Sequence, residues 1–248
     1  MSRETRLLMG MPITIEIVDN GFDGMLTEAF AIFADVDARF SLWKPESEIC
    51  GLNRGELAQA DASPEMREVF ALAERTKAET AGFFDMRRPD GTVDPSGIVK
   101  GWAVRKVADH IRAAGACNFF VDAGGDIQSS GNNQASEPWK VGIRNPFNPD
   151  QIIKAVTPKG WGIATSGNYV RGDHIYNPHN PAETVCGIVS LTVIARDVLE
   201  ADRFATAAFA MGKTGIHFIE QQPDLEGYVV DKKGVATQTS GFGAYVTP

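Results

Sequence analysis

Apolar side chains recur at spacings of three and four between residues 97 and 114, and this pattern predicts an amphipathic helix. Ser96 stands directly before the pattern, where its hydroxyl can accept a hydrogen bond from a first-turn N–H group. Gly115 follows the pattern and supplies a helix stop. The buried face of this helix is predicted to contain Ile98, Val104, Val107, Ala108, Ile111 and Ala114.

The same periodicity predicts a helix over residues 23–40 and another over residues 197–211. Ser63 and Pro64 predict the start of a further helix, because serine suits the N-cap and proline suits the first helical position. That helix is expected to end before Gly82. A short helix is expected over residues 215–221.

Alternating and short apolar runs predict strands, most of them in the second half of the chain. Residues 6–18 alternate with an interruption at residues 10–12, and residues 41–55 have the polar, Pro- and Gly-containing composition of a surface loop. The remaining strands are expected over residues 118–122, 127–130, 139–144, 152–157, 162–165, 185–195, 227–230 and 243–246. Helices mixed with many short strands indicate an α+β protein.

Composition narrows the class of protein further. With 248 residues the chain can bury a large core, and 43% apolar with 23% charged residues is typical of a globular protein. A net charge of -8 argues against a nucleic-acid-binding surface. Three cysteines without CxxC spacing fit free thiols in a reducing compartment. The N-terminus resembles neither a signal peptide nor a membrane anchor, so a cytoplasmic location is expected.

The start of the helix at residue 97 has the electrostatics to hold a phosphate. Free N–H groups, small residues and Lys100 one turn into the helix all favour an anion there. The alternative is an ordinary capped helix followed by a strand and a glycine turn, which many α/β proteins contain. No Walker motif or dinucleotide fingerprint is present.

Asp202 and Thr206 lie four residues apart in the predicted helix over residues 197–211, so they project from one face. A carboxylate and a hydroxyl at this spacing suit Mg²⁺, which takes one or two carboxylates with water and phosphate oxygens. The alternative is structural: Asp202 caps the helix or pairs with Arg203 or Arg105, and Thr206 packs. Small residues around the pair leave room for a ligand.

Residues 163–167 end in two hydroxyls and a glycine, where exposed N–H groups could bind a ligand. The alternative is an ordinary strand-to-loop exit whose hydroxyls bond the local backbone. His174 follows on a predicted short strand beside this corner and is the histidine best placed for chemistry. His110, His179 and His217 are expected to be structural or solvated.

Nine stretches in a fixed order now point to a known family. From Met9 almost to the C-terminus, the chain resembles the FAD:protein FMN transferase family, also called the ApbE family. The motifs are MGMP, FSLWKPESEICGLN, GFFD, VDPSGIVKGWAV, FFVDAGGD, VGIRNP, IATSGNY, HIYNP and ADRFATAAFAMG.

The resemblance implies an enzyme that uses Mg²⁺ to move FMN from FAD to a Ser or Thr hydroxyl of an acceptor flavoprotein, releasing AMP. It implies an α+β fold of two interleaved lobes with mixed or antiparallel sheets, flanking helices and a ligand cleft between them, built as one domain over residues 1–248. No nucleic acid and no membrane anchor is expected as a partner.

The resemblance also implies roles for single residues. Asp202, Thr206 and the carbonyl of Gly97 would bind the metal, His174 would be the base, and Lys100 would act in catalysis as well as binding. The residues expected to contact FAD are Met9, Trp43, Phe83, Phe84, Asp85, Asp94, Lys100, Gly124, Gly125, Ser166 and Tyr176.

Two departures from the family pattern concern the acceptor. The family has an acidic residue at the position of Asn177 and a glycine at that of Pro181, so the loop after His174 is expected to differ in shape. Two other functions remain open from the sequence. One is hydrolysis of FAD to FMN and AMP, with water in place of the acceptor, and the other is FAD binding without turnover.

Overall fold

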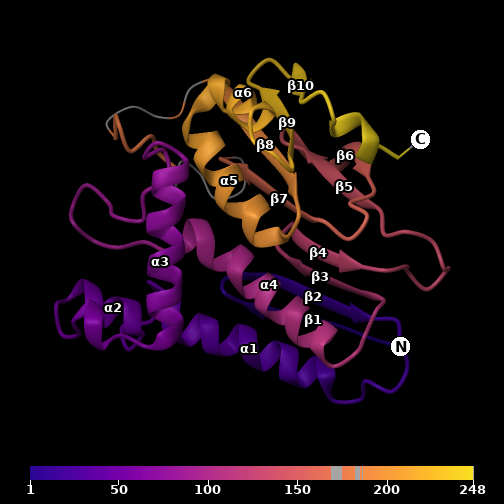
Figure 1. Cartoon of the computed structure of the whole chain (residues 1–248), viewed down its shortest axis with the longest axis horizontal. Coiled ribbons are helices and arrows are strands. Elements are labelled where there is room, and N and C mark those ends of the chain that lie inside the picture. Colours follow the sequence, from indigo (N-terminus) through magenta and orange to yellow (C-terminus); the bar gives the residue numbers. More distant parts are fainter. Residues whose placement is uncertain (169–174, 182–184, 186, 248) are drawn as a thin grey trace.

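The computed structural model describes residues 1–168, 175–181, 185 and 187–247. Eight strands form one sheet in which every neighbouring pair is antiparallel (Figure 1). In their order across the sheet they are β1 (Ser2–Leu8), β2 (Met11–Ile17), β3 (Phe119–Ala123), β4 (Asp126–Ser130), β7 (Gly162–Gly167), β8 (Ile188–Ala195), β9 (Leu225–Asp231) and β10 (Ala236–Gln238). The α+β class with antiparallel sheets and flanking helices is therefore confirmed.

A separate hairpin and the helices complete the fold. The hairpin consists of β5 (Val141–Asn145) and β6 (Asn148–Val156). The α-helices are α1 (Met25–Phe40), α2 (Glu48–Asn53), α3 (Pro64–Glu79), α4 (Ser96–Ala113), α5 (Val198–Ala210) and α6 (Gly215–Glu220). Short 3₁₀ turns are η1 (Gln59–Asp61), η2 (Gly212–Thr214) and η3 (Phe242–Tyr245).

Alternate residues of the strands face two different cores. On the helical face, Ile13, Ile15 and Val121 pack in one cluster with apolar residues of α1 and α4. Further along the sheet, Ala164 and Val193 pack with α5 on that face. Residues of opposite alternation, including Ile127, Ile163 and Ile194, pack with the β5–β6 hairpin. The sheet is thus covered by helices on one face and partly by a hairpin on the other.

Glycines allow the two central helices to approach closely. A Cβ atom on Gly101 of α4 would lie 2.7 Å from Cβ of Asp202 and 2.9 Å from the backbone oxygen of Val198, both on α5. A Cβ on Gly97 would lie 3.1 Å from Cγ2 of Thr206. Because no side chain separates the backbones here, the two helices bring their polar residues together.

Several boundaries differ from the sequence-based predictions. The chain over residues 6–18 is a hairpin, β1–β2, that turns at Met9 and Gly10, both with positive φ. The expected loop over residues 41–55 contains helix α2, which Ser47 caps by accepting a hydrogen bond from the Cys50 N–H. The closing strand over residues 243–246 was wrong: that segment contains η3, and β10 was missed.

The N-cap assignment of Ser96 was also wrong. Helix α4 begins at Ser96 itself, and Pro95 occupies the cap position without a side-chain hydrogen bond. Asp94 Oδ1 instead accepts a hydrogen bond from the Ser96 N–H at 2.9 Å. The aspartate two residues earlier satisfies the first N–H group because its short side chain can accept a hydrogen bond from the backbone two residues further along the chain.

Across the described residues, the structure contains no helix with the length and apolar character needed to cross a membrane.

Candidate functional site

A cavity of about 840 Å³ opens at the end of the sheet where β3 turns into β4. Its walls come from the β1–β2 turn, residues 83–88, the first turns of α4, strand β5, the end of β7 and helix α5. This volume is in the range of ligand pockets in proteins. The fold therefore gathers into one cavity residues that are up to 200 positions apart, such as Gly10 and Ala210.

Three oxygen-bearing groups that could bind a metal lie where α4 and α5 are in contact. Thr206 Oγ1 donates a hydrogen bond to the Gly97 carbonyl at 3.3 Å, and Asp202 Oδ2 accepts one from the Gly101 N–H at 2.8 Å. Asp202 and Thr206 lie one turn apart on α5, as predicted, and both line the cavity. The structure thus brings together the three residues expected to bind a metal.

The carboxyl group of Asp202 has an unusual environment. Its residue is only 4% exposed. Burial, together with the negative charge of Asp126, raises the pKa of this carboxyl to about 8, even though Lys100 and the Gly101 N–H act to lower it. A nearby cation would favour the carboxylate form and offset the effect of burial.

Lys100 and Asp126 form an ion pair beside this cluster. Lys100 Nζ lies 2.7 Å from Asp126 Oδ2, and Asp126 is 1% exposed at the start of β4. The second oxygen, Oδ1, accepts a weak hydrogen bond from the Thr165 N–H at 3.3 Å. Asp126 Oδ2 is buried, and Lys100 Nζ is its close charged partner in the part of the chain that the structure describes. Lys100 is therefore held at the oxygen cluster by a residue of the sheet.

The residues present fit a hard divalent cation such as Mg²⁺. The oxygen atoms that could bind it are those of a carboxylate, a hydroxyl and a carbonyl, and the buried Asp126 carboxylate lies nearby. Mg²⁺ needs few protein ligands because water and phosphate oxygens complete its shell. Within the described ranges no group of three His, Cys, Asp or Glu side chains could hold a metal.

The segment over residues 83–88 forms an aromatic and charged wall. Phe84 is buried, and its ring would lie 3.2 Å from a Cβ atom on Gly97. Phe83 meets the ring of His179 edge-on at 4.6 Å between centroids. Asp85 lies 2.7 Å from Lys77 Nζ. Phe83, Phe84 and Asp85 all line the cavity, as expected of residues that contact a ligand.

Tyr176 lies against the same wall. Its hydroxyl donates a hydrogen bond to the Arg87 carbonyl at 3.2 Å, and partial burial raises the pKa of its phenol. His179 Nε2 lies 2.9 Å from the Ala81 carbonyl oxygen. These contacts join residues 175–181 to the aromatic wall. His174 itself lies outside the described residues.

The anion site expected at the start of α4 is partly occupied by the protein. Asp94 accepts from the Ser96 N–H, and Arg88 donates a hydrogen bond to Asp94. One free N–H of the helix start is therefore already satisfied by a carboxylate. Asp94, Ser96 and Arg88 all line the cavity. Arg88 and Lys100 are two cationic groups of the cavity lining, and each is paired with an aspartate.

The turn between β3 and β4 supplies the cavity floor. Gly124 and Gly125 both have positive φ, which a glycine adopts without strain. The Gly125 N–H donates a hydrogen bond to Asp122 Oδ1 at 2.7 Å. Burial raises the pKa of the Asp122 carboxyl. Ser166, at the end of β7, faces the same cavity, so the predicted residues of both segments meet there.

Two predicted contact residues do not line the cavity. Met9 stands next to it, in the β1–β2 turn, where it is partly buried against the core. Trp43 lies between α1 and α2 and is 93% exposed. The motif around Trp43 did not reveal this, because a large aromatic residue in a polar loop can equally be an anchor or a free side chain.

Other cavity residues were missed by sequence reasoning. The lining also includes Asp122, Arg88 and Arg144. Asp126 forms an ion pair with the lining residue Lys100. Asp126 had a recognisable signal: an acid directly after two glycines that end a buried strand. Arg144 had none, because only the packing of the β5–β6 hairpin brings it to the cavity.

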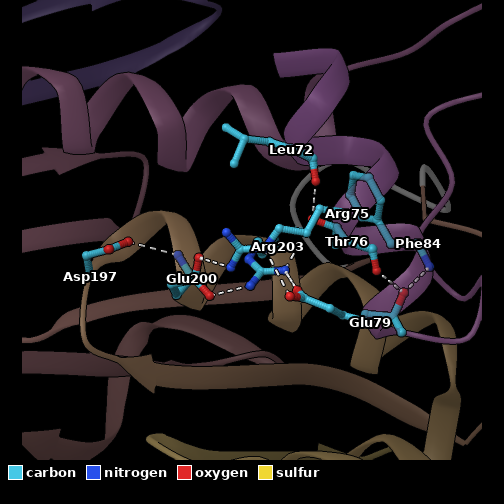
Figure 2. A network of polar contacts seen from close by, with 9 residues as sticks. Leu72, Arg75, Thr76, Glu79, Phe84, Asp197, Glu200 and Arg203 are labelled. Atoms are coloured by element: carbon cyan, nitrogen blue, oxygen red, sulfur yellow. Dashed lines mark hydrogen bonds and ion pairs between the residues drawn. The ribbon is translucent and has the colours of Figure 1, made fainter. Parts of the chain in front are cut away.

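A buried arginine of α5 connects this helix to α3 (Figure 2). Arg203 follows Asp202 on α5, is 2% exposed, and pairs with Glu79 and Glu200. It also donates to Thr76 Oγ1 at 3.3 Å. The C-terminal end of α3 is connected to the aromatic wall, because Oγ1 of the C-cap residue Thr80 accepts a hydrogen bond from the Phe84 N–H at 3.1 Å. The pairing of Arg203 with Asp202 considered from the sequence is not what the structure shows.

The comparison with known families agrees with this geometry. The family model described as "ApbE family" matches residues 9–87 and 86–229. The chain belongs to the ApbE family. The curated relatives that match include a protein named FAD:protein FMN transferase from Vibrio cholerae serotype O1, which is 36% identical over 134 residues. That match covers 50% of this chain and 40% of the relative.

Matches to other ApbE-family relatives differ in extent. An FAD:protein FMN transferase from Klebsiella pneumoniae is 28% identical over 77% of this chain and 56% of its own length. One from Haemophilus influenzae is 24% identical over 94% of this chain and 87% of its own length. The matches to the Vibrio and Klebsiella relatives, and a further one to an FAD:protein FMN transferase from Salmonella typhimurium, span only 40%, 56% and 49% of the relative's length, which is about half.

Solved structures show the same fold over nearly all of the chain. The flavin transferase ApbE from Vibrio cholerae has a TM-score of 0.84 at 24% identity, covering 98% of both chains. The ApbE protein from Thermotoga maritima has a TM-score of 0.87 at 19% identity, covering 100% of this chain and 99% of that one. At this level of identity the likeness establishes the fold.

Proposed function

We propose that this ApbE-family chain is an FAD:protein FMN transferase. It would move FMN from FAD to a Ser or Thr hydroxyl of an acceptor flavoprotein through a phosphoester bond and release AMP. One observation carries the proposal: the oxygen atoms of buried Asp202 and of half-buried Thr206 and Gly97 share a cavity with Lys100 and the wall of Phe83 and Phe84. The names of the curated relatives support the same reaction.

The proposed step exchanges one phosphorus–oxygen bond for another. The acceptor hydroxyl oxygen attacks the phosphorus on the FMN side of the FAD diphosphate and forms the new phosphoester bond. The bond from this phosphorus to the bridging oxygen breaks, and AMP leaves with that oxygen. The hydroxyl proton passes to a base, for which we propose His174. A positioned base typically contributes about 10²–10⁴-fold to such a rate.

The chain's own groups would bind and orient the diphosphate. Asp202, Thr206 and the Gly97 carbonyl would hold Mg²⁺, which supplies charge neutralisation on the diphosphate when it is bound. Lys100, fixed by Asp126, places a second positive charge at the same end of the cavity. Phosphoryl transfer depends mainly on such positioning and charge stabilisation.

The remaining cavity residues would hold the rest of FAD. Phe83, Phe84 and Tyr176 offer aromatic surface to a flat ring. The turn at Gly124 and Gly125 lets the ligand approach the backbone closely. Asp85, Asp94 and Ser166 add polar groups around the same space. Met9 and Trp43 would reach FAD only by moving from the positions described above.

The test is product analysis with purified protein, FAD, MgCl₂ and candidate acceptor proteins from the same organism. The proposal predicts an acceptor that stays fluorescent on a denaturing gel, with one AMP released per flavin attached, and loss of both in EDTA. Free FMN with AMP and an unmodified acceptor would identify a hydrolase instead. Intact bound FAD would identify a carrier protein. Either result would contradict the proposal.

A further inference from the structure

Strand β5 has an unusual position beside the cavity. Among the described residues its strand partner is β6 alone, and the two form a sheet separate from the eight-stranded one. Val141 and Ile143 of β5 are buried against Ile127 and Ile163 of the large sheet. The hairpin is therefore fixed by its inward side chains, while one long edge of β5 lies away from β6.

The direction in which the N–H and C=O groups of Gly142 point can be derived from the edge of β6 that lies away from β5. There the Ala155 carbonyl accepts a hydrogen bond from the Thr247 N–H at 2.9 Å, so the peptide groups of Ala155 point away from β5. Gly142 stands directly opposite Ala155 in the antiparallel register. Opposite residues of an antiparallel pair point their peptide groups either toward each other or both outward. The N–H and C=O groups of Gly142 thus point away from β6.

This outward edge faces the cavity. Five consecutive residues, from Lys140 to Arg144, line it. Successive side chains of a strand point to opposite faces, so a run of five can line one space only if the strand edge borders it. Thr14, Phe120 and Asp122 of the large sheet line the same cavity. Lys100, Asp202 and Thr206 line it as well, so the edge of β5 and the oxygen cluster border one space.

We propose that the open edge of β5 receives an extended segment of the acceptor protein as an added strand, with backbone hydrogen bonds to Gly142. This docking mode rests on the proposed transferase function. An added strand obtains its affinity from main-chain hydrogen bonds and its specificity from alternate side chains. It would carry the Ser or Thr hydroxyl into the cavity that also contains the diphosphate-binding groups.

Charge indicates the kind of segment that fits. Lys140 and Arg144 alternate with the buried Val141 and Ile143, so they share the exposed face of β5 with Gly142. Both are cationic, although the chain as a whole has a net charge of -8. The preferred acceptor segment is therefore extended and carries acidic side chains beside the modified hydroxyl.

The experiment removes one backbone donor. Gly142→Pro deletes an N–H group that makes no bond to β6, and proline is tolerated in a strand edge at such a position. With the acceptor protein found in the transfer assay, its KM should rise at least about tenfold, as for a lost backbone hydrogen bond that leaves its partner unpaired. The dissociation constant of FAD should stay within about twofold of the wild type.

Gly142→Ala is the matched comparison, because it keeps the N–H group. Its added Cβ would meet the flexible end of Ile152, whose Cδ1 lies 2.7 Å away and which is itself 55% exposed. The acceptor KM of this variant should rise clearly less than that of Gly142→Pro. If Gly142→Pro does not fold, Lys140→Glu gives a second measurement: its acceptor KM should rise, and about 1 M salt should reduce the difference.

The outcomes separate the two proposals. A wild-type protein that transfers no FMN contradicts the transferase function and with it this docking mode. Normal wild-type transfer with unchanged acceptor KM in Gly142→Pro, or in Lys140→Glu where the proline variant is unfolded, overturns the docking mode alone. A weaker FAD affinity with unchanged acceptor KM also overturns it, since FAD would then occupy the edge. A variant that only alters self-association would assign the edge to a second copy of the chain.

Discussion

At the scale of single residues, Asp202 concentrates the chemistry of the site. Its carboxylate is buried, bonded to a backbone N–H of a neighbouring helix, and close to the charge of Asp126. A buried carboxylate without a full cation partner is costly, and the protein retains it where two helices and a strand converge. This cost is understandable if a divalent cation completes the site.

Asp202→Asn should therefore remove the metal effect without unfolding the protein. The amide can still accept from the Gly101 N–H but lacks the charge that a hard cation requires. We expect AMP release to fall at least about hundredfold, since changes merely next to metal ligands already cost 10–100-fold. The thermal midpoint without metal should not fall. Asp197→Asn, a capping change at the start of the same helix, is the control that should retain Mg²⁺-dependent activity.

The raised pKa of Asp202 predicts how metal binding depends on pH. The folded protein keeps a proton on Asp202 up to about pH 8, whereas the unfolded chain releases it near the ordinary value of 3.8. The contribution of this group to the unfolding free energy is therefore present at low pH and is lost as pH rises through about 8. Mg²⁺ must displace the proton. The half-saturating Mg²⁺ concentration should therefore fall by up to about tenfold for each unit that the pH rises toward 8.

Thermal-shift titrations with Mg²⁺ at about pH 6.5 and pH 8.5 would measure this dependence. The same titrations on Asp202→Asn should show no Mg²⁺-induced shift at either pH. Equal Mg²⁺ affinity of the wild type at both values would contradict the assignment of Asp202 as the titrating ligand.

Sequence reasoning found Asp202 and Thr206 because their spacing alone puts them on one helical face. It placed Gly97 with them through the family resemblance, and the structure confirms that the three lie together. It missed the role of Asp126, since that residue reaches Lys100 only after β3 and β4 pair and α4 packs on them. Local spacing predicts neighbours along one element but not partners across the fold.

At the scale of elements, the close contact of α4 and α5 positions the residues of the proposed metal site. The backbones approach at Gly97 and Gly101, where a side chain would collide with Thr206, Asp202 or Val198. The sequence indicated both helices, yet nothing in their periodicity predicted that these two glycines of α4 pack against α5. The same limit explains the wrong cap at Ser96 and the missed helix α2, which depend on short-range hydrogen bonds rather than on hydrophobic spacing.

Gly101→Ala should separate the two helices. Its Cβ would lie 2.7 Å from Cβ of Asp202 and 2.9 Å from a backbone oxygen, neither of which can move aside easily. Overpacking costs about 1–3 kcal/mol, which exceeds the gain of up to about 1 kcal/mol from alanine's helix propensity. Urea unfolding should show the loss. Gly51→Ala in α2 has no atom within 4 Å of its new Cβ and should not destabilise the protein. Equal stability of the two variants would refute this packing argument.

Arg203 links α5 to α3, and its removal should weaken that link. Arg203→Met leaves Glu79 and Glu200 without their buried partner. We expect a loss of about 3 kcal/mol, the lower end for breaking a buried pair, because both glutamates keep partial access to water. Urea unfolding measures this loss. Arg75→Met is the control: Arg75 contacts the same two glutamates from the surface and should cost at most about 1 kcal/mol. A small effect in both variants would contradict the role of Arg203.

At the scale of the whole molecule, one antiparallel sheet joins the two halves of the chain (Figure 1). Strands β1–β4 and β7–β10 place the β3–β4 turn, the end of β7 and the helices α4 and α5 around one cavity. The order of strands across this sheet could not be read from periodicity, because strand pairing depends on contacts between distant segments. The α+β class and the family could be inferred, since nine motifs keep their order along the chain.

The central claim is that the oxygen donors at the α4–α5 contact hold a divalent cation against the diphosphate of FAD. A crystal structure with FAD and Mn²⁺, which scatters anomalously and takes the same oxygen ligands as Mg²⁺, tests it most directly. The account predicts an anomalous peak bound by Asp202, Thr206 and the Gly97 carbonyl, next to the two phosphates of FAD. FAD bound elsewhere, with no metal at these three residues, would contradict it.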